Sequence, residues 1–211
     1  MQIKEAIEEI KSKSKKRNFV QSVDMVINFQ RLDLKKPENK LNITLALPKG
    51  KGKKPKIVAI VGNELSTEAK KVADKIIMAD ELQKIGQDKK TAKKIARDYD
   101  IFIAQTDLMA AVGKHMGQVL GTRGKMPRPV PPTAKLEALV KSLSGSIIIK
   151  TKTLPTIHVY VGTEEMSNED LEANASAIIS AVKEKLPNKE GNLKSIFVKT
   201  TMGQPVKVDL K

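Results

Sequence analysis

The pattern of hydrophobic and polar residues changes twice along the chain. At the start, three isoleucines recur at helical spacing within residues 2–16, which predicts an amphipathic helix. Two β-branched or alternating runs follow, Val23–Phe29 and Leu41–Leu47, and predict strands joined through a turn at Pro37–Asn39. This first part therefore has the order helix, strand, strand.

From Lys56 onward, short apolar runs alternate with helical patterns. The helix after the first run should begin at Ser66, and the last one at Thr133, because serine and threonine are favoured N-caps. Alternation of this kind is typical of a parallel sheet with helices on both faces. The expected strands are 57–62, 75–78, 101–104 and 146–149, and the expected helices are 66–75, 80–86, 91–98, 106–120 and the segment after Thr133.

After Lys152 the pattern changes again, to a strand at 156–162, a long helix capped by Ser167, and strands at Ser195–Thr201 and Val206–Leu210. The two outer pieces are each too small to bury a good core alone. We therefore expect a two-domain protein of the α/β and α+β classes. Residues 1–54 plus 154–211 would form a split α+β outer domain, an antiparallel sheet with two helices. Residues 55–153 would form an inserted Rossmann-like α/β domain with a parallel sheet, reached through basic hinge segments at 48–56 and 151–155.

The net charge of the chain indicates which classes of binding partner it suits. The 211 residues carry a net charge of +15, to which 1–54 contributes 14 basic and 6 acidic side chains, whereas 154–211 is close to neutral. Such a balance points to nucleic acid or an anionic membrane surface. No apolar run approaches the roughly 18 residues of a membrane span, and no signal-peptide pattern begins the chain, so we expect no membrane partner and a cytoplasmic location. Four Phe, two Tyr and no Trp leave few platforms for base stacking, which favours recognition of RNA by shape and backbone.

The residues of known catalytic motifs are missing. The stretch GTRGKM departs from the Walker pattern, no G-x-G-x-x-G follows the first apolar strand, and the chain has no cysteine. The only histidines, His115 and His158, are far apart, so we expect no metal, no cofactor and no enzymatic activity. Two alternatives stay open at this point: a nucleotide-binding α/β enzyme, and a non-specific basic protein that binds nucleic acid or a membrane surface.

Three stretches are candidates for binding an anionic partner. The segment Gly117–Pro132 holds three glycines, four prolines and no acid, and is expected to be a basic loop. Lys15–Phe19 is a basic step with one aromatic residue, and Lys199–Gly203 places two hydroxyls, a methionine and a glycine at a strand end. The alternative interpretations are structural: a solvated helix end, a core phenylalanine and an ordinary β-turn.

Two of these stretches carry a family resemblance. LGTRGKMPRP (120–129) and VKTTMGQPVKV (198–208) resemble the two hallmark segments of the large ribosomal subunit protein one family, in the same order. The segment NFQRLDLKKPENKLN resembles the archaeal–eukaryotic branch of that family. The resemblance covers the whole chain, including the arrangement of an inserted α/β domain within a split outer domain.

The resemblance implies a ribosome-associated structural protein, monomeric when free, that binds the rRNA of the large-subunit stalk through its outer domain. It also implies assistance in releasing deacylated tRNA from the exit site, and translational repression through a hairpin in the protein's own mRNA. Asn18 stands where bacterial members have lysine, and Gln204 separates the T-M-G turn from Pro205. The implied RNA-binding residues are Arg17, Asn18, Phe19, Gln21, His158, Ser195, Thr200, Thr201, Met202 and Gly203. Separately, the basic loop offers Arg123, Lys125 and Arg128 as candidates for a secondary contact to other RNA or to tRNA.

Overall fold

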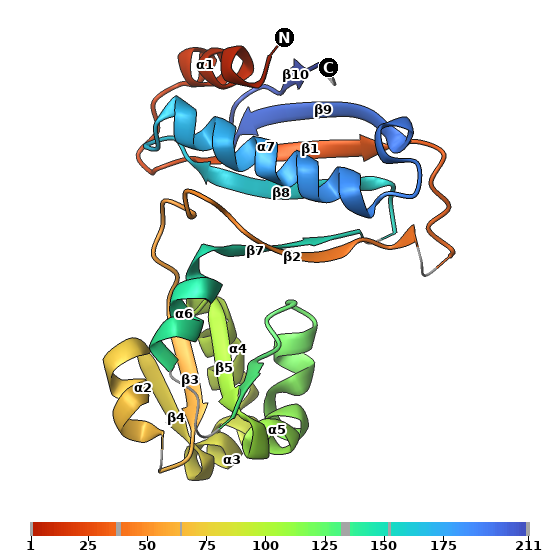
Figure 1. Cartoon of the computed structure of the whole chain (residues 1–211). Helices are drawn as coiled ribbons and strands as arrows, with labels where there is room; N and C mark the ends of the chain where they lie inside the picture. The colour runs from red at the N-terminus through yellow and green to blue at the C-terminus, as the bar shows by residue number, and fades with distance from the viewer. Residues whose placement is uncertain (1, 37–38, 64, 132–135, 152, 210–211) are drawn as a thin grey trace. The chain divides into compact units, whose positions relative to one another are not determined.

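A computed structural model describes residues 2–36, 39–63, 65–131, 136–151 and 153–209 (Figure 1). The chain divides into two compact units: Met1–Lys53 with Gly145–Lys211, and Lys54–Ser144. We call them the split unit and the inserted unit. The expected turn at Pro37–Asn39 and the expected cap at Thr133 fall wholly or partly outside the described residues.

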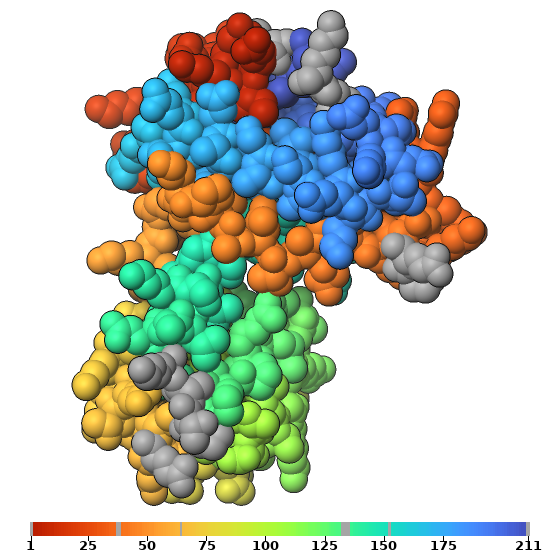
Figure 2. Space-filling view, viewed as in Figure 1, coloured from red at the N-terminus to blue at the C-terminus, as the bar shows by residue number. Residues whose placement is uncertain are grey.

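The split unit is built on a four-stranded antiparallel sheet with the order β10-β9-β1-β8. Strand β1 (Ser22–Phe29) lies in its interior and pairs with β8 (Thr156–Thr163) and β9 (Leu193–Thr200), while β10 (Val206–Val208) forms an edge. The N-terminal and C-terminal parts of the chain are therefore neighbours in one sheet, as the orange β1 beside the blue β9 in Figure 1 shows. Figure 2 shows the surface of helix α1, in red, packed beside the blue C-terminal part.

Helices α1 (Ile3–Lys13) and α7 (Asn168–Lys185) cover one face of this sheet, because the apolar residues of both helices share a core with alternate residues of β1. The expected cap of α7 is present, since the Ser167 hydroxyl accepts a hydrogen bond from the Asp170 amide at 3.1 Å. Helix α1 is shorter than the predicted 2–16. It ends at Lys13 because Ser14 is extended (φ −75°, ψ 125°), and residues 15–20 then run exposed into β1.

One predicted strand belongs to the other unit. Ser146–Lys150 (β7) pairs antiparallel with β2 (Asn42–Ala46) and not with the parallel sheet, so the second boundary between the units lies at Gly145 rather than at 153–154. The burial of β7 alternates, with Ile147 and Ile149 in the core of the split unit and Ile148 exposed. A one-sided strand of this kind suits a ribbon on a core, whereas a strand inside a parallel sheet is buried on both faces.

The beginning of the expected hinge at 48–56 is fixed to the split unit. The buried Asn174 accepts a hydrogen bond from the Lys49 amide at 3.1 Å, and its own amide group donates to the Gly50 carbonyl at 3.0 Å. The Tyr160 hydroxyl donates to the Lys51 carbonyl at 2.6 Å. Residues 49–51 are therefore part of the packed structure and not a free linker.

The inserted unit confirms the expected parallel sheet, in the order β4-β3-β5-β6. Separate apolar clusters lie on its two faces, which is the layered arrangement of a doubly wound fold. The strands are β3 (Ile57–Val61), β4 (Lys75–Met78), β5 (Ile101–Gln105) and β6 (Arg128–Val130); α3 (Ala79–Gln87), α4 (Lys89–Asp98) and α5 (Met109–Gly121) supply one cluster, and α2 (Ser66–Val72) and α6 (Leu136–Gly145) the other.

The sequence interpretation of Gly117–Pro132 as one long loop is wrong. Helix α5 continues through Gly117 to Gly121, and Arg128–Val130 forms β6, which pairs with β5. Only residues 122–127 connect them. The N-cap of α2 is Leu65 and not Ser66, which is the first helical residue.

Candidate nucleic-acid interface

The two ends of the folded chain meet where β1 begins and β9 ends. The Thr201 hydroxyl accepts a hydrogen bond from the Ser22 amide at 2.9 Å and lies 2.9 Å from the Ser22 hydroxyl. The Thr201 amide donates to the Ser22 carbonyl at 3.0 Å. These bonds attach the turn after β9 to the first residue of β1, although the two lie 179 positions apart in the sequence.

The turn Thr200–Gly203 needs its glycine. The Gly203 amide donates to the Thr200 carbonyl at 3.1 Å and closes the turn. A Cβ atom on residue 203 would lie 2.2 Å from the hydroxyl oxygen of Thr200, whose side chain is fully buried. The turn therefore has a single compact shape, and it holds Thr201 and Met202 outward, the latter with 61% of its surface exposed.

Gln21 connects four segments from inside the protein. Its side-chain amide donates to the Ser14 hydroxyl at 2.9 Å and to the Glu164 carboxylate at 3.1 Å, and its carbonyl oxygen accepts from the Met202 amide at 3.3 Å. The backbone amide of Gln21 also donates to the Glu164 carboxylate, at 3.0 Å. Because Gln21 is 1% exposed, it positions the turn and the end of α1 rather than presenting a surface. Thr200, also buried, has the same structural role, with its hydroxyl 3.2 Å from that of Ser14.

Large apolar side chains are exposed at this end of the sheet. Phe19 is 52% exposed and Val20 is 49% exposed, and both lie in the segment that enters β1 beside the turn. Isolated exposed apolar residues are common in proteins, but a group of them beside a preformed turn is a candidate binding surface. The predicted residues Arg17 and Asn18 are exposed in the same segment. We call Phe19, Val20, Thr201, Met202 and Gly203 the turn surface.

The sheet face opposite α1 and α7 continues from the turn surface. The even-numbered residues of β1 lie on this face and are partly exposed, whereas the odd-numbered ones are buried against the helices. A row of side-chain hydrogen bonds crosses three strands here, from Thr156 to Asn28 at 2.9 Å and from Asn28 to Ser195 at 3.0 Å. We call this surface the open face, formed by Ser22, Asp24, Asn28, Thr156, His158, Tyr160, Ser195, Phe197 and Lys199.

The open face includes two predicted residues, Ser195 and His158, and several that the sequence interpretation missed. Ser195 lies about 20 Å along β9 from Thr201, at 3.3–3.4 Å per residue. His158 is exposed on β8 opposite Val26. The missed residues could have been found from the alternating pattern of β1, but only with knowledge of which strands flank it.

A carboxylate sits in the middle of the open face. Burial raises the pKa of Asp24 above its usual range, and the Ser22 hydroxyl, which donates to it at 3.3 Å, and the charges of Lys199 and His158 only partly offset that effect. Burial, with the nearby Asp24 charge, also raises the pKa of Tyr160. The open face therefore combines hydroxyl, amide and aromatic groups with few net charges.

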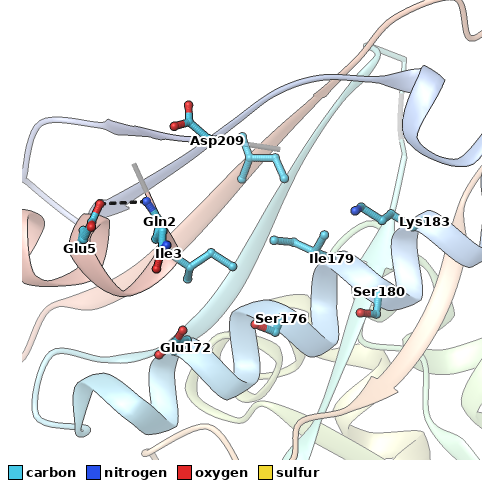
Figure 3. Close-up of a pocket in the computed structure, with 10 residues that line it drawn as sticks. Gln2, Ile3, Glu5, Glu172, Ser176, Ile179, Ser180, Lys183 and Asp209 are labelled. Atoms are coloured by element: carbon cyan, nitrogen blue, oxygen red, sulfur yellow. Dashed lines mark hydrogen bonds between the residues drawn. The ribbon is translucent and has the colours of Figure 1, made fainter. Parts of the chain in front are cut away.

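The helix side of the split unit has a different character. A hollow of about 540 Å³ lies between α1 and α7. Figure 3 shows Ile3 and Ile179 on its wall. Its charged lining residues are Glu5, Glu172, Lys183 and Asp209, which leaves an acidic excess. An acidic lining repels phosphate, so this side is a poor candidate for RNA.

The three predicted cations of the inserted unit have different environments. Lys125 is one-quarter exposed, and its ammonium group donates to the carbonyls of Tyr99 at 2.6 Å and Ala96 at 3.1 Å, so it caps the C-terminus of α4. Arg123 is exposed and donates to the Lys93 carbonyl at 3.3 Å. Arg128 is exposed on β6 and also interacts with another group of the protein. Lys125 is thus a structural residue, whereas Arg123 extends the basic surface of α4.

Among the residues that the structure describes, no group of three or more His, Cys, Asp or Glu side chains is placed to hold a metal ion. None of the described helices is both long and apolar enough to cross a membrane.

A split antiparallel sheet with an exposed turn, interrupted by a doubly wound unit, makes this a two-unit protein of the α/β and α+β classes. Comparison with known proteins names the family. The chain belongs to the ribosomal protein L1p/L10e family, whose profile matches residues 7–204.

Full-length relatives agree. The chain is 45% identical over 207 residues to the large ribosomal subunit protein uL1 of Methanothermococcus thermolithotrophicus, covering 98% of this chain and 97% of the relative. It is 43% identical over 208 residues to that of Methanothermobacter thermautotrophicus, covering 98% of each. It is 42% identical over 206 residues to that of Thermococcus kodakarensis, covering 97% and 95%.

Family membership confirms the resemblance inferred from the two hallmark segments and its archaeal character. It also confirms that the chain is a structural constituent of the ribosome and not an enzyme. The ribosome-associated location follows from the same membership.

Proposed function

We propose that this chain binds the rRNA of the large-subunit stalk through the split unit, and that the turn surface is the centre of that contact. The observation that carries the proposal is the turn Thr200–Gly203, which internal hydrogen bonds and one obligatory glycine hold in a single shape while Met202 stays exposed. A preformed surface loses little conformational entropy on binding, so little of the free energy gained from its contacts is offset by ordering.

The chemistry of the turn surface suits folded RNA. Its hydroxyl and backbone groups match the 2′-hydroxyls and sugar edges that an A-form minor groove displays, and Phe19 and Met202 can pack on ribose or an exposed base. The exposed basic segment Lys15–Arg17 adds contacts to phosphate beside it. The open face, with Ser195 and His158, extends the same surface along the strands.

The finer parts of the function rest on the family resemblance and on this one surface. A stalk-like hairpin in the protein's own mRNA would bind the turn surface in competition with rRNA, which is the requirement for translational repression. Assistance in releasing deacylated tRNA from the exit site would follow from the protein's place on the stalk. The free protein is proposed to be a monomer.

The test is the substitution Thr201→Val, measured by filter binding to a minimal stalk hairpin with excess tRNA as competitor. Loss of a hydroxyl that organises a buried contact should cost about 1–3 kcal/mol, or roughly 5- to 150-fold in affinity. Met202→Ala should fall in the same range through lost packing. The control is Thr67→Val, an exposed threonine of the inserted unit that should bind like the wild type. Wild-type affinity in Thr201→Val would rule out the turn surface as the centre of the interface.

A further inference from the structure

A dense group of basic residues lies on helix α4 of the inserted unit. Helix α4 has ten residues, of which five are cations: Lys89, Lys90, Lys93, Lys94 and Arg97. All five are exposed, whereas Ala92, Ile95 and Ala96 are buried against the unit. The cations at 90, 93, 94 and 97 follow the i, i+3, i+4, i+7 spacing that places side chains on one side of a helix.

This arrangement works against the stability of the helix. Lys89 and Lys93, and likewise Lys90 and Lys94, are like charges at i and i+4, which destabilise a helix. The first turn of α4 holds two lysines and no acid, although the positive end of a helix dipole disfavours cations. The N-cap Asp88 compensates for part of this effect, through its bonds to the Lys90 amide and the Thr91 hydroxyl.

The positive charge is hardly neutralised within the protein. Among the described residues, the ion pairs include Arg97 with Asp98 but none of the four lysines. Arg123 adds a further exposed cation, because its guanidinium binds the Lys93 carbonyl in the middle of the helix. Lys125, through its bonds to Ala96 and Tyr99, holds the 122–127 connection on the end of α4. We call Lys89, Lys90, Lys93, Lys94, Arg97 and Arg123 the α4 face.

We propose that the α4 face is a second RNA-binding surface, which binds the phosphate backbone of a double-stranded RNA segment without regard to its sequence. A ten-residue helix spans about 15 Å, long enough to follow several successive phosphates. Lysines are point charges on flexible stems, which suits phosphates at variable positions and not a bidentate readout of base edges. A bound polyanion would offset the like-charge repulsion along α4. Binding would therefore remove the destabilisation of α4 that is present in the free protein.

An RNA duplex is a better fit than an anionic membrane. The exposed side of α4 has no apolar residue in its sequence KKTAKKIARD that could enter a bilayer, since Ile95 and both alanines are buried. Surface helices that bind membranes pair their cations with an exposed apolar side. The chain also belongs to a family of ribosomal proteins, whose surroundings are rich in duplex RNA.

The experiment measures binding of the full-length protein to a duplex of arbitrary sequence, about 16 base pairs long, that lacks the stalk hairpin. Fluorescence anisotropy is recorded between about 50 and 200 mM salt. The triple variant Lys90→Gln, Lys93→Gln, Lys94→Gln should make the negative slope of log K against log[salt] shallower by about 2, since each lost phosphate contact contributes about 0.7–0.9 to its magnitude. At about 100 mM salt it should bind at least tenfold more weakly.

The matched control is Lys70→Gln, Lys71→Gln, Lys141→Gln, which removes three exposed lysines from other helices of the same unit. It should leave the slope nearly unchanged. An equal loss in both triple variants would mean that diffuse net charge binds the duplex, and an unchanged slope in the α4 variant would mean that the helix is only solvated; either result overturns the proposal.

Two further measurements distinguish the α4 face from the turn surface and a duplex from a membrane. Thr201→Val should keep the duplex slope while weakening the stalk hairpin; if it lost both, the duplex would be binding at the turn surface and the proposal would fail. The α4 variant should keep its affinity for the hairpin, so failure of one proposal leaves the other testable. If vesicles containing phosphatidylserine, and not the duplex, lost affinity for the α4 variant, a membrane surface would be the partner instead.

Discussion

At the turn surface the amides of Thr201, Met202 and Gly203 already have partners within the protein, whereas the lysines of the α4 face have no ion pair among the described residues. The turn is held by Gln21, by Thr200 and by the bonds between Ser22 and Thr201. The lysines of the α4 face, in contrast, project from a single helix and are not fixed by such bonds within the described part of the chain. The turn surface therefore offers one shape, and the α4 face offers charge.

The difference corresponds to the two components of RNA affinity. Contacts with fixed geometry discriminate between RNA shapes and change little with salt, whereas phosphate contacts supply affinity that falls steeply with salt. A protein that carries both on separate units can hold one RNA structure specifically and a neighbouring duplex loosely. Substitutions that alter one surface at a time test whether the two are independent in this way.

The largest effect is expected from Gly203→Ala. The new Cβ would collide with the Thr200 hydroxyl, which cannot move into solvent because Thr200 is buried. The turn must then change shape, and hairpin affinity should fall by about 100-fold or more, corresponding to about 2.7 kcal/mol. Isothermal titration calorimetry with the stalk hairpin measures it. Gly113→Ala is the control, since a Cβ there meets open space on α5. Equal affinity in both variants would show that the turn is adaptable.

Gln21→Leu should come next, because it removes the bonds to Ser14, Glu164 and the Met202 amide together. Leaving buried polar groups unsatisfied costs about 1–3 kcal/mol of stability. We expect a lower midpoint in urea unfolding and roughly tenfold weaker hairpin binding. Gln83→Leu, which replaces an exposed glutamine of α3, should change both quantities little. If Gln21→Leu lost stability but kept its affinity, the residue would support the fold without shaping the turn.

The substitution Lys125→Met tests whether hairpin binding depends on the stability of the inserted unit. The substitution keeps the apolar stem and removes the ammonium that caps the carbonyls of Ala96 and Tyr99. The inserted unit should lose about 1–2 kcal/mol of stability, while binding of the stalk hairpin stays unchanged. Differential scanning calorimetry and hairpin titration measure the two effects. Lys114→Met, an exposed lysine of α5, is the control. A loss of hairpin affinity would mean that the inserted unit takes part in the specific contact.

Asp24→Asn should have the smallest effect and the opposite sign. Because the folded-state pKa of Asp24 is raised, the charged carboxylate disfavours the fold at neutral pH; the stability linked to its protonated form is complete below the unfolded-state pKa and is lost as the pH rises through the folded-state pKa. The variant should therefore be slightly more stable than the wild type at pH 7, and the advantage should vanish below about pH 4. Thermal unfolding across pH measures it.

The same substitution should strengthen hairpin binding a few-fold at neutral pH, because it removes a negative charge from the open face. Glu8→Gln is the comparison, since it removes an exposed negative charge from α1, on the other side of the sheet, and should leave hairpin binding nearly unchanged. Weaker binding by Asp24→Asn would show that the carboxylate accepts hydrogen bonds from RNA hydroxyl groups.

The sequence by itself determined most of the local structure and the family. Periodicity located α1, α7 and the strands of both four-stranded sheets except β6, because amphipathic spacing reflects burial on one side. The two hallmark segments indicated the family, which the comparison confirmed. Proline and glycine content, in contrast, led to the wrong prediction of one loop over Gly117–Pro132, because an edge strand tolerates proline and a packed helix tolerates glycine.

Tertiary structure alone decided which residues share a surface. β7 belongs to the split unit because it pairs with β2, a long-range choice that its own apolar residues do not specify. Gln21 and Lys125 are of residue types that often bind RNA, but here both make hydrogen bonds within the protein. Their partners come from segments distant in the sequence, so the sequence alone does not reveal this role. The open face became visible only once β1 lay between β8 and β9, since strand pairing sets which alternate side chains are neighbours.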